Sequence, residues 1–128
     1  MTCRLELIED KDIYVKYYFK WLKKIPMANG STHADLLANC MNGALQGILL
    51  VKDDTPVGLL VFEETSKEEL YIPALYMVGQ TENFRPLLYD AFRKLGYKRL
   101  KGISTPPDSY HFKWAKSKRL YTCFEVLL

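Results

Sequence analysis

Two long apolar runs near the middle of the chain limit its fold more than any other feature. Residues 47–52 and 57–63 are almost continuously hydrophobic, and the polar stretch 53–56 joins them. Apolar runs of this length on either side of a turn predict a β-hairpin. Because the apolar residues are continuous rather than alternating, both faces of the hairpin must be covered. We therefore expect a sheet with helices on both faces.

A third strand of this sheet is expected at residues 69–78, after a polar turn at 64–68. Pro73 lies inside that strand and has no N–H to donate to a neighbouring strand. The proline therefore predicts a β-bulge or a sheet edge at this point.

Helical spacing dominates the part of the chain before the hairpin. In residues 13–25, apolar and aromatic side chains recur every three or four positions. This spacing predicts one helix, which the Pro, Asn and Gly residues of 26–30 would end. Ser31 or Thr32 can cap a second helix that runs to about residue 41.

The second half of the chain alternates between helices and strands. We expect a helix capped by Asn83 and ended by Gly96, a strand at 98–104, a short basic helix at 110–118 and a closing strand at 121–128. With a first short strand at 5–8, the element order is β-α-α-β-β-β-α-β-α-β. A chain of 128 residues has the length of one domain.

This order of elements resembles the GNAT superfamily of N-acetyltransferases over nearly the whole chain. The resemblance implies one α/β domain, residues 1–128, with a mixed sheet and helices on both faces. It also implies that the fourth and fifth strands part at their C-terminal ends. The pantetheine arm of acetyl-CoA then pairs with the open edge of the fourth strand, which would include Met77 and Gly79 here.

The resembled superfamily carries the pattern Gln/Arg-x-x-Gly-x-Gly/Ala before its crossover helix, where backbone N–H groups bind the pyrophosphate. In this chain Gln80 fits the pattern, but Asn83 and Arg85 replace the two small residues. In one reading, Asn83 adopts a glycine-like conformation and Arg85 pairs with a phosphate. In the other, which we favour, the cofactor site has been lost and Asn83 only caps the helix. Phe84, Arg85 and Tyr110 would then fill the cleft between the strands.

The resemblance also suggests catalytic groups. Members of the superfamily often use a carboxylate on the fourth or fifth strand as general base and a tyrosine on the last helix as general acid. Glu69 and Tyr110 are the candidates here, although Tyr110 stands at the start of its helix rather than late in it. The neighbouring glutamates 63, 64 and 68 fit a solvated turn, and Glu69 fits that description as well.

Positive charge is concentrated in one part of the chain. Residues 85–119 hold ten Lys and Arg against two Asp, a local charge of +8 in a chain whose overall charge is +3. Tyr97, Tyr110, Trp114 and Tyr121 lie among them, so this basic half could bind nucleic acid by phosphate contacts and base stacking. The alternative is that the Lys and Arg side chains lie on the solvent-exposed faces of the helices while the aromatic rings pack in the core.

The predicted helix at 13–25 is crowded with aromatic side chains: Tyr14, Tyr17, Tyr18, Phe19 and Trp21. These positions wrap around a helix, so one face is buried in the domain and other rings are exposed or contact a partner. We therefore expect a protein partner.

Cysteines and hydropathy indicate the compartment. Three widely spaced cysteines without a CxxC pair predict reduced thiols rather than a disulfide framework or a metal site. No uncharged run is long enough to span a bilayer, and the first residues lack a secretory signal. We expect a cytoplasmic protein with no membrane contact.

The altered loop decides the functional prediction. We expect a non-enzymatic or catalytically weakened GNAT-like protein that acts by binding and needs no cofactor. One form of this reading is a phage virion or assembly component, because small GNAT-like phage proteins have similarly altered loops. The alternative is an active acetyl-CoA-dependent N-acetyltransferase, and a further alternative is a nucleic-acid-binding module.

Overall fold

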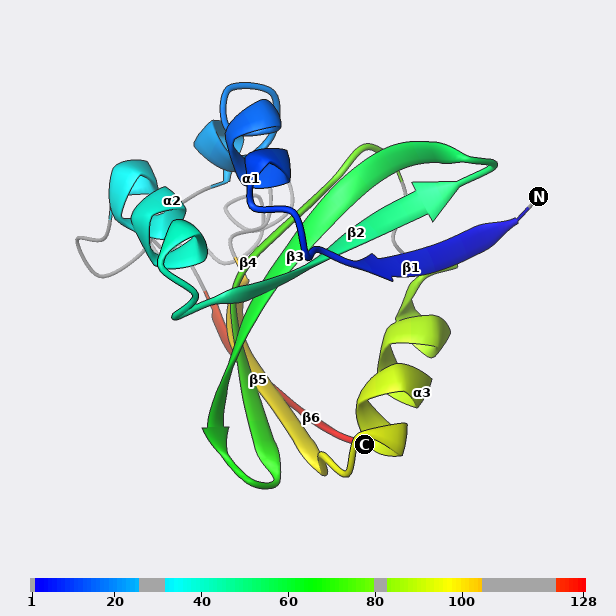
Figure 1. Cartoon of the computed structure of the whole chain (residues 1–128). Coiled ribbons are helices and arrows are strands. Elements are labelled where there is room, and N and C mark those ends of the chain that lie inside the picture. The colour runs from blue at the N-terminus through cyan, green and yellow to red at the C-terminus, as the bar shows by residue number, and fades with distance from the viewer. Residues whose placement is uncertain (1, 26–31, 80–82, 105–121) are drawn as a thin grey trace, which may run out of the picture.

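A computed structural model describes residues 2–25, 32–79, 83–104 and 122–128. Its centre is a six-stranded sheet in the order β1-β2-β3-β4-β5-β6, with every neighbouring pair antiparallel except β4 and β5 (Figure 1). The strands are β1 (Cys3–Leu7), β2 (Gln46–Lys52), β3 (Thr55–Ser66), β4 (Glu69–Met77), β5 (Arg99–Ser104) and β6 (Thr122–Leu127). This mixed sheet confirms the predicted α/β class.

The continuous apolarity of β2 and β3 is explained by two cores, one on each face of the sheet. On one face, Leu49 and Val51 pack beneath α1 (Asp12–Lys16), the short 3-10 helix η1 (Leu22–Lys24) and α2 (His33–Met41). On the other face, Ile48 and Leu50 pack with the side chains of α3 (Arg85–Lys94). Figure 1 shows α1 and α2 on the opposite side of the sheet from α3. The prediction of helices on both faces is confirmed.

The loop of the hairpin is shorter than the predicted four-residue turn at 53–56. β3 already begins at Thr55, so the loop is Asp53 and Asp54, both with positive φ (51° and 65°). Two such residues match the right-handed twist of the flanking strands. The backbone N–H of Thr2 donates to Asp53 Oδ1 at 2.8 Å, and Arg4 forms an ion pair with Asp54. These contacts fasten the turn to β1. At its other end β3 continues to Ser66, through much of the predicted polar turn.

The bulge predicted at Pro73 is present. Val61 pairs with Ala74 and Glu63 pairs with Tyr71, so two residues of β4 lie opposite the single residue Phe62. The extra residue falls at Ile72–Pro73, where the proline has no N–H to offer the ladder.

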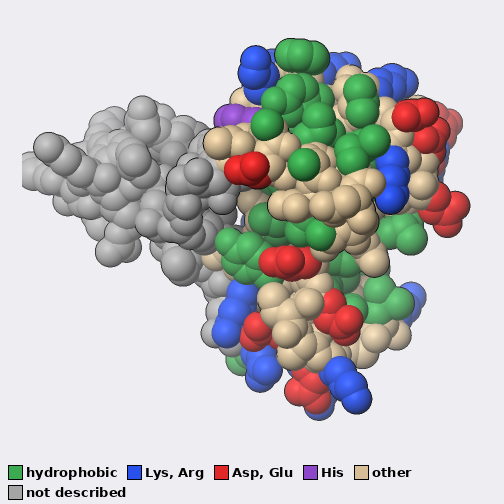
Figure 2. All heavy atoms as spheres, turned by 60° about the vertical axis from the view of Figure 1, so that its left-hand side comes forward, with side chains coloured by type: hydrophobic (Ala, Val, Ile, Leu, Met, Phe, Trp, Pro, Cys, Tyr) green, Lys and Arg blue, Asp and Glu red, His purple; other side chains and the backbone are tan. Residues whose placement is uncertain are grey.

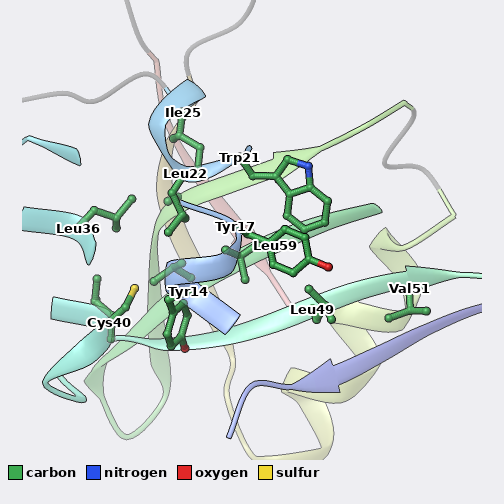
Figure 3. Packing of buried hydrophobic residues seen from close by; sticks show 13 residues of the cluster. Tyr14, Tyr17, Trp21, Leu22, Ile25, Leu36, Cys40, Leu49, Val51 and Leu59 are labelled. Carbon is green, nitrogen blue, oxygen red and sulfur yellow. The ribbon is translucent and has the colours of Figure 1, made fainter. Parts of the chain in front are cut away.

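The single helix predicted for residues 13–25 is wrong, because the helical turns widen after α1. The N–H groups of Leu22 and Lys23 bond the carbonyls five residues earlier, at 3.1 and 2.8 Å. Trp21 still donates its N–H to the Tyr17 carbonyl at 2.8 Å, and the rings of these two residues form a parallel stack with centroids 4.0 Å apart (Figure 3). The spacing of apolar residues therefore predicts helical turns in this segment. It does not predict the change from the α-helix α1 to wider turns and then to the 3-10 helix η1.

The helix boundaries follow the capping residues only in part. Thr32 caps α2 as predicted, and its hydroxyl accepts from the Asp35 N–H at 3.1 Å while Asp35 reaches back to the Thr32 N–H. For α3, however, the N-cap is Phe84 rather than Asn83. The predicted helix at 110–118 lies outside the described residues.

Candidate active site

Strands β4 and β5 run together for only four residue pairs and then part. Glu69–Ile72 pairs with Arg99–Gly102 and no further. Beyond this point β4 continues along β3 as far as Met77, and β5 continues along β6 as far as Ser104. The separation begins at the Pro73 bulge, which bends the bulged strand and ends its pairing on this side. The predicted splay of the fourth and fifth strands is therefore present.

The parted section of β4 presents backbone groups to the gap. Val78 donates its N–H to the Val57 carbonyl of β3 at 2.8 Å. In an antiparallel ladder, alternate residues bond the same neighbour. The N–H groups of Leu75 and Met77 therefore point away from β3, toward the gap. Met77 lies where the sequence placed a cofactor-binding residue, and Gly79 follows with a φ of +91° that favours glycine.

A cavity of about 340 Å³ lies between α3 and the sheet, and Leu75 of the parted section of β4 is one of its lining residues. Its sheet side includes Ile72 and Leu75 of β4 and Leu100 of β5. Its helix side includes Phe84 and Arg85. Phe84 is buried and Arg85 is exposed, yet the cavity remains beside them. Phe84 and Arg85 thus line this cavity rather than fill it, and Tyr110, the third residue expected to fill the cleft, lies outside the described residues.

The expected phosphate-binding end of the site is the start of α3. Arg85 is the first residue of this helix, where the orphan N–H groups and the helix dipole favour an anion. Asn83 is exposed just before it. Gln80, the one residue that fits the family pattern, lies outside the described residues.

Glu69, the predicted general base, lies at the paired end of β4 rather than in the gap. Its carboxylate accepts from the Thr65 hydroxyl at 2.7 Å and forms ion pairs with Lys101 at 3.0 Å and Arg99 at 3.5 Å. The Thr65 hydrogen bond, followed by the Lys101 contact, lowers the pKa of Glu69. The carboxylate is therefore ionised near neutral pH and is a weak base. The predicted acid, Tyr110, lies outside the described residues.

Four of the six described cations of the basic half form ion pairs with carboxylates. Lys98 pairs with Glu68 at 3.1 Å, Arg93 pairs with Asp90 at 3.2 Å, and Arg99 and Lys101 share Glu69. The local charge counted along the sequence thus overstates the positive charge that this part of the surface offers to a nucleic acid. The sequence could not show this, because most of these acids lie outside residues 85–119.

The described ranges contain no group of three His, Cys, Asp or Glu side chains able to hold a metal ion. No helix within these ranges has the length and hydrophobicity that crossing a bilayer requires.

Comparison with known proteins agrees with this geometry. No protein-family model and no curated protein matches the sequence. Among solved structures, the chain is similar to the PaiA N-acetyltransferase of Thermoplasma acidophilum in complex with coenzyme A (TM-score 0.62, 11% identity, 100% of each chain). It is also similar to Campylobacter jejuni PseH in complex with acetyl-CoA (TM-score 0.54, 11% identity, 98% of this chain and 99% of that one). A third is the Escherichia coli ribosomal-protein-S18-alanine N-acetyltransferase (TM-score 0.58, 10% identity, 85% and 71%).

These similarities correct the functional prediction. The three proteins are acetyltransferases, and two of the structures hold coenzyme A or its acetylated form. The preference for a non-enzymatic or weakened protein is therefore wrong, the expectation that no cofactor is needed is not confirmed, and nothing in the comparisons supports a phage virion protein. At this level of identity the comparisons establish the architecture, and the chain has the GNAT fold.

Proposed function

We propose that this protein is an acetyl-CoA-dependent N-acetyltransferase. The observation that carries the proposal is the parting of β4 from β5 at Pro73, beside an apolar cavity of about 340 Å³. An open strand edge is normally covered or charged, because unpaired backbone groups attract other chains. A strand edge that no described residue pairs with, next to a cavity, suits a ligand that carries amide groups on an otherwise apolar arm.

The described residues fit acetyl-CoA in three places. The backbone N–H groups of Leu75 and Met77 would bond the amide carbonyls of the pantetheine arm. Ile72 and Leu100 would contact its apolar carbons, because both line the cavity. Arg85 would pair with a phosphate at the start of α3. When bound, acetyl-CoA supplies an acetyl group activated as a thioester.

The acceptor amine must lose a proton to attack that group, and acid–base catalysis by the protein is the remaining requirement. Glu69 remains our predicted base and Tyr110 our predicted acid. Since Glu69 lies on the paired side of the bulge, we infer that it would take the proton through water. Its ion pairs with Lys101 and Arg99 hold it as a carboxylate, the form that accepts a proton.

Two measurements test the proposal. Calorimetric titration with acetyl-CoA should give a dissociation constant well below about 1 mM, the scale of only ~4 kcal/mol of binding. Thiol release should then be followed with a panel of amines, using a mixture without protein to subtract spontaneous hydrolysis. A dissociation constant of about 1 mM or weaker would contradict the proposal of an acetyl-CoA-dependent enzyme. Tight binding without transfer to any amine would leave a cofactor-binding protein only.

A further inference from the structure

The turns from α1 to η1 carry a lysine-rich surface that acetyl transfer does not explain. We define the lysine face as Lys16, Phe19, Lys20, Lys23 and Lys24. Phe19 is 72% exposed, and neighbouring Val15 is 51% exposed. At the upper end of the molecule in Figure 2, where Figure 1 places α1, hydrophobic side chains lie among Lys and Arg side chains. No Asp or Glu occurs in the sequence from residue 13 to residue 34.

Three of the four lysines on the lysine face lie over aromatic rings rather than beside carboxylates. Lys16 and Lys20 stand 5.4 and 5.9 Å from the Tyr17 ring centre, and Lys23 stands 5.3 Å from that of Phe19. Within the part of the chain that the structure describes, none of the four lysines forms a salt bridge. By contrast, Lys98, just before β5, forms a salt bridge with Glu68. Cation–π contacts orient a lysine but leave its charge available.

The rings beneath the lysine face connect it to the parted section of β4. Tyr17 stacks on Trp21, and Trp21 in turn packs against Tyr76 of β4 with ring centres 6.3 Å apart. Lys20 stands 5.5 Å from the Trp21 ring. Tyr17 and Trp21 are both buried, and Figure 3 shows their side chains in the core. The lysine face therefore lies over rings that are packed in the core. A partner bound there would approach β4 from the face of the sheet opposite the cavity, with the Tyr17 and Trp21 rings between the partner and the strand.

We propose that the lysine face docks an acidic segment of a polypeptide. Charge complementarity favours an acidic partner, and the exposed Phe19 ring offers it an apolar contact. The choice of a polypeptide rests on the proposed function, since an acetyltransferase needs an acceptor amine near its cleft. The face holds no arginine, the residue best suited to bidentate phosphate contacts. Two exposed apolar side chains on so short a helix are also too few for an interfacial membrane helix.

The test uses the full chain without acetyl-CoA and a short, fluorescently labelled glutamate-rich peptide. Fluorescence anisotropy measures the affinity of the wild type, of Lys20→Ser/Lys23→Ser and of the control Lys67→Ser/Lys94→Ser. Lys67 and Lys94 are exposed lysines away from the face, so both double variants lose two charges. We expect the first variant to weaken binding roughly fivefold to tenfold and the control by less than about twofold. Phe19→Ala should weaken binding without changing the charge.

Several results would overturn the proposal. They are no binding of the peptide by the wild type, equal weakening in both double variants, and binding of a single-stranded oligonucleotide or of anionic lipid vesicles in preference to the peptide. Acetyl-CoA titration of the same variants separates this proposal from the proposed function. An unchanged acetyl-CoA affinity beside a lost peptide affinity supports docking at the lysine face. Failure of acetyl-CoA to bind even the wild type would count against the proposed function, while peptide binding that depends on Lys20 and Lys23 would still support docking at the lysine face.

Discussion

Gly58 of β3 and Tyr76 of β4 approach so closely that only a glycine fits between the strands. A Cβ atom at position 58 would lie 2.5 Å from the Tyr76 carbonyl oxygen and 3.1 Å from the Met77 Cα. Both neighbours are backbone atoms of the parted section of β4, so they can move away only if the strand moves. This approach sets where the open edge of β4 lies.

Gly58→Ala should therefore disturb both stability and the site. We expect the free energy of unfolding to fall by about 1–3 kcal/mol, as for other overpacked positions. Acetyl-CoA affinity should fall as well, because β4 is displaced. Gly96→Ala is the control: it introduces strain at a φ of +97° at the end of α3, far from the gap, and meets no neighbouring atom. It should lower stability by about 1–2 kcal/mol and leave acetyl-CoA binding unchanged.

Leu75→Trp tests whether the cavity takes the cofactor. Leu75 lines the cavity but is 42% exposed, so a larger ring can fold back into the cavity with a stability change within about 0.5 kcal/mol. Acetyl-CoA affinity should fall at least about tenfold, or ~1.4 kcal/mol. Leu95→Trp makes the same exchange at an exposed position outside the cavity and should bind like the wild type. Equal affinities for both variants would place the cofactor elsewhere.

Arg85→Gln tests the phosphate contact. The loss of a charged hydrogen bond should weaken acetyl-CoA binding by about 1.5–3 kcal/mol without unfolding the protein, because Arg85 is exposed. Lys94→Gln removes the same charge at the other end of α3 and should leave the affinity unchanged. If the Arg85 variant binds like the wild type, Arg85 is not a phosphate ligand.

Acid stability reports the environment of Glu69. The folded-state pKa of Glu69 is lowered, so its stabilising effect is complete above the ordinary glutamate pKa of about 4.3 and is lost as the pH falls through the folded value. Urea unfolding between about pH 5 and pH 3 should show a steeper loss of stability for the wild type than for Glu69→Gln. Glu9→Gln, an exposed control, should follow the wild-type curve.

The same variant tests catalysis by Glu69. If Glu69 is the general base, Glu69→Gln should lower kcat about 100-fold or more while leaving acetyl-CoA affinity intact. An unchanged kcat would make Glu69 a structural partner of Lys101 and Arg99 only.

Cys40 should resist alkylation in the folded protein. It is 1% exposed, and burial raises its pKa to about 11, so little thiolate is present near neutral pH. Treatment with iodoacetamide followed by peptide mass spectrometry should show Cys3, which is partly exposed, modified long before Cys40. In urea both should react. Equal rates in the native protein would contradict the burial of Cys40.

Much of the fold could be predicted from local patterns. The continuous apolarity of β2 and β3 required cover on both faces, Pro73 marked the bulge, and Thr32 marked the start of α2. These signals act over a few residues, so they can be read along the chain. The helix at 13–25 could not be predicted correctly, because its course depends on Trp21 packing against both Tyr17 and Tyr76, and Tyr76 comes from a strand far away in the sequence.

Some features of the candidate site could be predicted from the sequence, and others could not. Local patterns in the sequence predicted the hairpin, the bulge at Pro73 and a helix starting close to Arg85, while Met77 and Gly79 were named as cofactor-binding residues only through the resemblance to the GNAT superfamily. Only the tertiary structure decided that Glu69 is bound by Thr65, Lys101 and Arg99, and that a cavity remains beside Phe84 and Arg85. Ion pairs and cavities form between segments that are far apart in the sequence. The spacing of residues along the chain does not show which of these segments will meet.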